Sequence, residues 1–412
     1  MQAMEERLKS FSRLDAMFNA DWATQLINDV RLSFSLDLEA RVSLSRTGSY
    51  IAISHGLGLS IDDAVLNALC VRGFYTARLA SDQRPPAFGV LSIGAARPER
   101  YHDYTFVEAG AGREATITRA MPLEPVRLAQ AELLSYFALR WVVLHEQAHW
   151  LLGHLHLLAS AHAVEGLDFG EARLFAEGEE EDVVDAFAME LQADALATQS
   201  LVVELLSLET NSAPPLAAYR QTLDLDPEQE VRFAPQPETR SMRFRTALLA
   251  AGICAVLFDL RRQKIDAVSD SHPPPAARIV NIALSAIATY GDIAQFEQGG
   301  EAAYTQEYRT DLIRPAGNDL MTSLVDLEIV ARFLDLESPI YQSRFLFAND
   351  AGPSSEDGAS PLAQDIFDLL LKGRRAHKGL VTDAGRIFAG HLDRSKHLYQ
   401  KLQPFARVSG FV

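Results

Sequence analysis

Cysteine is scarce in this chain, and no apolar run is long enough to cross a bilayer. The 412 residues include two cysteines, Cys70 and Cys254, which excludes a disulfide framework as the main source of stability. The N-terminal stretch lacks the apolar segment of a secretory signal. The most apolar run, 247–258, has about half of the roughly 20 residues that a membrane span needs. We therefore expect a cytoplasmic protein that does not insert into a membrane.

Basic residues are also in deficit. The chain has 38 Lys and Arg against 55 Asp and Glu, a formal net charge of −17. Because nucleic-acid affinity depends on basic side chains that neutralise phosphates, this balance argues against a nucleic-acid partner. The hydrophobic fraction of 48% is enough for a substantial core.

The first 120 residues favour a mixed region that contains a sheet. Apolar residues alternate from Val30 to Leu44, which predicts one or two strands with one buried face. We also predict a helix over 1–20, a strand over 50–54 and shorter strands around 87–94 and 104–118. A further helix is expected to begin near Ser60, with Asp62 and Asp63 in its first turn.

After Pro125 the apolar residues recur at helical spacing. This pattern predicts helices over 128–162, 181–207, 242–264, 275–290 and 319–336. Loops are expected over 211–215 and 226–239, with a linker over 349–361. The predicted fold class is α+β, mainly α. We divide the chain into an N-terminal region (1–120), a helical catalytic domain (121–300) and a C-terminal helical, regulatory region (301–412).

The sequence W-V-V-L-H-E-Q-A-H-W contains the pattern H-E-x-x-H at His145, Glu146 and His149. Residues four apart on a helix are offset by about 40° and about 6 Å along the axis, so both imidazoles can hold one ion. Glu146 lies beside the first ligand and can deprotonate a water on that ion. Two imidazoles and a carboxylate suit Zn²⁺ with a fourth position open. The alternative interpretation is a solvated helix face that happens to carry two histidines.

The third ligand separates the classes of such enzymes. A metzincin requires Gly at position 152 and His at position 155, and both are Leu here. The other class requires a Glu on a later helix, and the run 185–198 offers Glu190, with Asp194 one turn on. Glu190 would bind the metal, and Asp194 could accept the second ring N–H of a ligating histidine. An ordinary amphipathic helix with exposed acids is the competing interpretation of this run.

Taken together, these motifs resemble the H-E-x-x-H…E-x-x-A-D signature of gluzincin peptidases, which includes the prenyl-protein-processing peptidases and the soluble Lit-type phage-exclusion peptidases. Further matches are Gly153-His154, the segment Ser271-His272-Pro273-Pro274 followed by Arg278, and the strand and turn over 49–57. The resemblance implies a gluzincin-like zincin core and a zinc-dependent endopeptidase acting on a specific protein, in stress or phage defence. It also implies that His272 or Arg278 stabilises the oxyanion or binds substrate. An ion pair to the catalytic helices is the alternative role of Arg278.

Several points stay open at the level of sequence. In gluzincins a sheet edge receives the substrate as an added strand, and either 30–44 or 50–54 can form that edge. On a continuous helix His154 lies about 180° from His145 and cannot bind the same ion. We therefore interpret His154, His156 and His162 as packing, metal-supporting or surface residues. A regulatory protein partner is also expected. The competing functions are a metal-containing regulatory or binding protein without proteolysis, and a non-peptidase zinc hydrolase.

Overall fold

The computed structural model describes 125–162, 180–207, 240–264 and 275–297 without interruption, together with most of 26–69. It also describes 74–75, 100–107, 114–121, 167–168 and 273, and shorter stretches over 4–11 and 316–407. The described residues between Met4 and Phe11 are helical, as are 316–324. The strand predicted over 87–94, the loops over 211–215 and 226–239 and the linker over 349–361 lie outside the described residues.

The main sheet has the strand order β1-β3-β2-β6. Strand β1 (Val30–Ser33) pairs in parallel with β3 (Gly48–Ser54), and β2 (Ala40–Ser45) pairs antiparallel with β3. The short strand β6 (Leu167–Asp168) adds to β2. The alternating segment thus forms two strands, and its buried face carries residues such as Val42. Because β3 lies between two strands, the 50–54 segment is not a sheet edge, whereas β1 is an edge within the described part.

Helix α2 (His55–Leu69) follows β3 without a turn, so the predicted start near Ser60 is wrong, as is the expected turn within 49–57. The Ser54 hydroxyl accepts a hydrogen bond of 3.0 Å from the backbone N–H of Leu57. A serine hydroxyl at this position satisfies one of the free N–H groups at the start of a helix. The cap is therefore Ser54, and Asp62 lies in the middle of the helix, where its carboxylate pairs with Arg7 at 3.0 Å.

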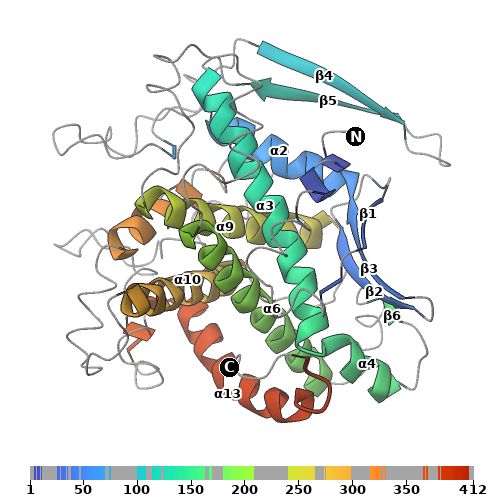
Figure 1. Ribbon diagram of the computed structural model, residues 1–412, viewed down its shortest axis with the longest axis vertical. Coiled ribbons are helices and arrows are strands. Elements are labelled where there is room, and N and C mark those ends of the chain that lie inside the picture. The colour runs from blue at the N-terminus through green and yellow to red at the C-terminus, as the bar shows by residue number, and fades with distance from the viewer. Residues whose placement is uncertain are drawn as a thin grey trace.

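Strands β4 (Arg100–Val107) and β5 (Glu114–Met121) form an antiparallel pair. The prediction of one broken strand over 104–118 therefore covers parts of two strands. This pair lies apart from the main sheet, and β5 packs against α2 (Figure 1).

The helical part contains α3 (Pro125–Leu151), α4 (His154–His162), α6 (Glu180–Ser207), α9 (Arg240–Lys264), α10 (Pro275–Glu297) and α13 (Asp383–Leu402). The single helix predicted over 128–162 is wrong, because it is interrupted at 152–153. Gly153 has a φ of +80°, a left-handed conformation that glycine adopts without steric cost. A Cβ on Gly153 would lie 2.6 Å from the backbone carbon of Phe405, so a larger residue does not fit there.

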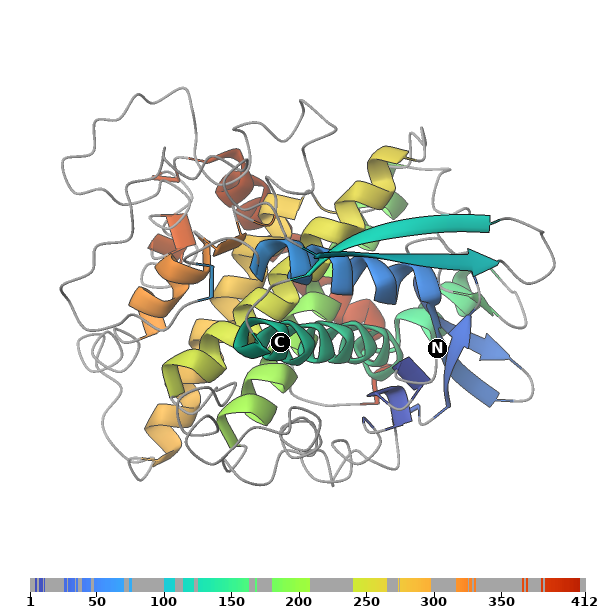
Figure 2. The same ribbon diagram turned by 90° about the horizontal axis from the view of Figure 1, so that it is seen from above.

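Helix α3 occupies the middle of the molecule, with the sheet on one side and α6 and α9 on the other (Figures 1 and 2). Helix α10 packs on α6 and α9, and α13 packs on α6 and α10. One hydrophobic core joins residues from all three predicted regions, from Met4 to Leu402. The architecture is mainly helical with a small sheet, as predicted. The division into three regions stays a prediction, and the continuous core ties them together.

Two helices are long and apolar enough to cross a membrane by length and composition, Arg240–Phe258 in α9 and Ala276–Glu297 in α10. The first is 83% buried inside the protein and the second 50% buried. Both pack against other helices, as the core helices of a folded domain do. This packing makes them weak evidence for membrane insertion.

We predict that Tyr75 stays protonated in the folded protein to a higher pH than a free tyrosine, so that the protein loses stability as the pH rises from 10 to 12. Burial raises the pKa of this phenol to about 12, although its hydrogen bond with Thr246 acts in the opposite direction. The folded-state pKa lies above the value of about 10 for a free tyrosine. The contribution of protonated Tyr75 to the free energy of unfolding is therefore complete below pH 10, and it is lost as the pH rises through 12. Urea unfolding from pH 9 to 12 should therefore show a steeper loss of stability for the wild type than for Tyr75→Phe. Parallel curves would contradict this.

Candidate metal centre

Helices α3 and α6 run antiparallel and pair side chains at every turn. The contacts step four residues along each helix in opposite directions: Trp141 with Thr198, His145 with Asp194, and His149 with Glu190. Residues four apart share one face of a helix, so one stripe on α3 faces one stripe on α6. The two sequence motifs meet because this pairing brings H-E-x-x-H against E-x-x-A-D.

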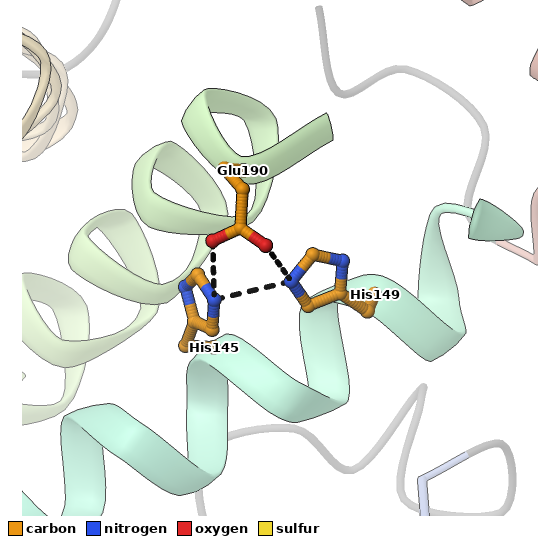
Figure 3. Close-up of side chains that lie close together, drawn as sticks. All are labelled: His145, His149 and Glu190. Atoms are coloured by element: carbon orange, nitrogen blue, oxygen red, sulfur yellow. Dashed lines mark hydrogen bonds and ion pairs between the residues drawn. The ribbon is translucent and has the colours of Figure 1, made fainter. Parts of the chain in front are cut away.

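His145, His149 and Glu190 form a buried cluster that can hold a metal ion (Figure 3). Each histidine presents Nε2, and these two atoms lie 3.1 Å apart. Glu190 reaches down from α6 between them, with Oε2 at 3.5 Å from His145 Nε2 and Oε1 at 3.7 Å from His149 Nε2. The three side chains are 3% exposed or less.

The distances between the two histidine nitrogens and the nearer Glu190 oxygen of each are close to those between neighbouring ligands of a tetrahedral ion. Zinc binds such ligands at about 2.0–2.2 Å, and two ligands at the tetrahedral angle then lie about 3.3–3.6 Å apart. The observed distances of 3.1, 3.5 and 3.7 Å scatter around that range. Three ligands from the described residues leave a fourth position for water. The donor set therefore fits zinc, although geometry alone does not identify the metal.

Asp194 and Arg278 hold the side of the cluster next to His145. Asp194 Oδ1 lies 3.0 Å from His145 Nδ1, the nitrogen turned away from the cluster. Asp194 is therefore close enough to stabilise a hydrogen on this nitrogen. Arg278, from α10, donates to both oxygens of Asp194, at 2.7 and 2.5 Å, and lies 4.0 Å from Glu190. These contacts favour the ion-pair interpretation of Arg278.

The electrostatics of the cluster favour a positive charge at His145. Burial lowers the pKa of His145, but the carboxylates of Asp194 and Glu190 outweigh burial and raise it to about 9. A bound metal at Nε2 would replace the proton that these carboxylates stabilise there. Arg278 also has a raised pKa, because Asp194 outweighs the effect of burial. Two buried carboxylates, Asp194 and Glu190, thus surround His145 together with the guanidinium of Arg278.

Two of the three residues between the histidines, Glu146 and Gln147, face in different directions. Glu146 is buried at 5% exposure on the same helix as both ligands. Gln147 lies on the opposite face of α3, where its amide accepts from the backbone N–H of Ile27 at 2.9 Å and donates to the Ile27 carbonyl at 2.7 Å. Because Ile27 precedes β1, Gln147 ties the lead into the sheet edge to the metal-binding helix. Sequence reasoning did not identify this role, since no local pattern signals it.

His154 is fully buried and contacts the metal-site histidines through His149. The two Nδ1 atoms lie 2.8 Å apart, and His154 Nε2 lies 3.1 Å from Gln192 Oε1. Burial lowers the pKa of His154 to about 4, which outweighs the opposite effect of Gln192, so this ring is neutral at pH 7. The break at Gly153 places His154 beside His149. The isolated glycine inside a helical pattern was the available signal.

The structure therefore brings together His145, His149, Glu190, Asp194 and Arg278. His272 lies outside the described residues. His156 is half-buried at the start of α4, beside the guanidinium of Arg407 at 3.3 Å and the ring of Trp150. Like His154, it is no part of the three-residue cluster.

A groove of about 780 Å³ lies between α6, α10 and α13. Its walls are largely apolar and include Leu196, Phe296 and Phe388. Gln192 and Gln199 of α6 also line the groove, whereas none of the three clustered ligands does. Gln192 thus lines this groove and also contacts His154 behind the metal cluster.

Comparisons with protein-family models, curated proteins and solved structures gave no significant match. The class that the fold and the site define is therefore a mainly helical protein with a buried His-His-Glu cluster suited to a metal ion.

Proposed function

We propose that this chain is a zinc-dependent peptidase with a gluzincin-like zincin core, in which His145, His149 and Glu190 hold Zn²⁺ and Glu146 is the general base. The observation that carries the proposal is the buried cluster itself, in which two histidine Nε2 atoms and the Glu190 carboxylate lie close enough together to bind one ion. The carboxylate of Glu146 beside the first ligand adds the base that a hydrolytic site needs and that a structural site does not.

The chemistry follows from the roles of these residues. Zinc, when bound, lowers the pKa of its water ligand and polarises the scissile carbonyl. Glu146 accepts the proton that the water loses as the new C–O bond forms, and it then passes that proton to the leaving nitrogen as the C–N bond breaks. Asp194 orients His145 through Nδ1, and Arg278 fixes Asp194 from α10.

The proposed substrate is one or a few specific cytoplasmic proteins, and the proposed setting is stress or phage defence. Unrestrained proteolysis in a cytoplasm is harmful, so we assign control to the C-terminal region or a regulatory partner. Contacts at the end of α3 support a role for that region. Arg407 donates its backbone N–H to the Leu151 carbonyl at 2.8 Å, and its guanidinium lies 3.8 Å from the centre of the Trp150 ring.

A second candidate is a regulatory protein in which the metal has a structural role. The burial of the cluster favours it, because structural zinc sites are closed to solvent. Against it, structural sites have four protein ligands as a rule, and the described residues supply three. A functional loss on substitution of Glu146 at unchanged metal content separates the two candidates.

Metal content tests the proposal directly. Elemental mass spectrometry of the purified full-length protein should find close to one zinc per chain. His149→Ala and Glu190→Ala should lose most of it, since each removes one of three ligands. Gln199→Leu, on the same helix as Glu190 but outside the cluster, serves as the matched control and should retain zinc. Well-folded wild type that stays free of zinc after supplementation would refute the proposed metal and the peptidase together.

Peptide cleavage tests the reaction. A peptide library from digested cell extract, incubated with the zinc-loaded protein, should gain new N-termini that mass spectrometry detects. These cleavages should disappear in His149→Ala. A zinc-replete wild type that cleaves no library peptide and no protein in whole extract would favour the second candidate.

A further inference from the structure

The metal-site histidines are each held from behind, but in different ways. Asp194 lies behind His145 and carries a charge that is shared with Arg278. Behind His149 lies a neutral pair of side chains, His154 and then Gln192. The role of this second arm, His154 and Gln192, rests on the proposed metal site.

The arm is built by the interruption of α3. The left-handed Gly153 ends the helix, and His154 begins α4 with its ring turned back against His149. The ring centroids lie 5.0 Å apart at an interplanar angle of 66°. Both rings are completely buried, so water does not replace either partner. The contact is therefore a fixed part of the site.

The partners determine which nitrogen atoms carry hydrogen. Complete burial favours a His154 ring with a single hydrogen, and because Gln192 Oε1 can only accept, that hydrogen is on Nε2. Its Nδ1 is then an acceptor, and the hydrogen of the 2.8 Å contact comes from His149 Nδ1. A neutral imidazole with hydrogen on Nδ1 has its lone pair on Nε2. In His149 that lone pair faces Glu190 and His145, where the ion would bind.

The opposite arrangement would block the site. If the Gln192 amide were reversed, its N–H would donate to His154 Nε2 and leave the hydrogen of His154 on Nδ1. His149 Nδ1 would then accept, and the hydrogen of His149 would stand on Nε2 in place of the metal. The orientation of the Gln192 amide therefore decides the state of His149, which is two hydrogen bonds away. In one orientation His149 Nε2 has a lone pair that can bind a metal, and in the other it carries a hydrogen that prevents binding.

We propose that Gln192 and His154 are positioning residues that hold His149 in the tautomer whose Nε2 binds the metal. Their contribution lies in metal affinity, because neither touches the reacting atoms. Loss of a hydrogen-bond partner behind a metal-binding histidine costs about 10- to 100-fold in metal affinity. We expect losses of this size when either hydrogen bond, from His149 to His154 or from His154 to Gln192, is removed.

The test measures zinc affinity by competition with a chromophoric chelator, on full-length protein. Gln192→Leu removes the acceptor at a half-buried position, and we expect about 10- to 100-fold weaker zinc binding. His154→Leu should behave alike, whereas His154→Asn keeps an acceptor oxygen near the position of Nδ1 and should recover part of the affinity. Gln199→Leu, which makes the same change seven residues along the groove-facing side of α6, should bind as the wild type does.

A second readout distinguishes this proposal from the proposed function. Nitrogen-15 NMR of the histidine side chains, with chelator present, should show His149 protonated on Nδ1 in the wild type and a mixture of tautomers in Gln192→Leu. Wild-type zinc affinity in Gln192→Leu would overturn the positioning role while leaving the zinc site intact. If the wild type binds no zinc, the proposed function fails, and hydrogen on His149 Nε2 in the NMR spectrum would overturn the positioning role as well.

Discussion

Glu146→Gln should reduce peptide hydrolysis by about 10²- to 10⁴-fold, the usual contribution of a positioned general base. Glutamine has nearly the size of glutamate but does not accept the proton of the attacking water. Glu146 is not among the three clustered ligands, so zinc content should be unchanged. The rate of cleavage and the zinc content should be measured on the same preparations.

A matched control for this substitution lies on the same helix. Glu132 is an exposed acid of α3, and Glu132→Gln makes the same chemical change away from the cluster. It should leave both the rate and the zinc content at their wild-type values. Near-wild-type cleavage by zinc-loaded Glu146→Gln would show that another group acts as the base. A loss of zinc in this variant would instead indicate that Glu146 takes part in metal binding.

Arg140→Met should destabilise the protein by about 3–5 kcal/mol, the cost of a buried charge left without its partner. Arg140 donates to Glu204 at 3.1 and 2.5 Å, and both side chains are 1% exposed or less. This pair joins the middle of α3 to the end of α6 and so contributes to the alignment of the two metal-binding motifs. The midpoint of urea unfolding, with zinc held at a fixed concentration, measures the effect.

Two further variants make the stability prediction specific. The double variant Arg140→Met/Glu204→Leu replaces the pair by apolar side chains and should recover most of the lost stability, since no charge stays buried alone. Arg31 and Asp29 form an ion pair of the same 2.5 Å distance on the surface, with 58% and 50% exposure. Arg31→Met should cost about 0–1 kcal/mol. Equal losses from the buried and the exposed substitution would contradict the role of burial.

Much of the architecture was predictable because helices leave a local pattern. Helices α6, α9 and α10 were predicted to within a few residues over most of their bounds, since apolar residues at helical spacing identify a buried face. The ends of the helices were predicted less accurately. Helix α2 begins at His55 after the cap Ser54, five residues before the start near Ser60 that Asp62 and Asp63 suggested, because a capping hydroxyl and acids in a later turn produce similar patterns.

The sequence by itself determined which residue types are available for a metal. These are two histidines one turn apart, a glutamate between them, and a glutamate and an aspartate on a later helix. It did not determine how α3 and α6 align, which depends on contacts between residues about 40 to 60 positions apart, such as Trp141 with Thr198. Only the tertiary structure placed Arg278 on Asp194 and turned His154 onto His149. The physical reason is that helix periodicity arises from neighbouring residues, whereas the ion pairs and hydrogen bonds around the cluster arise from packing between separate helices.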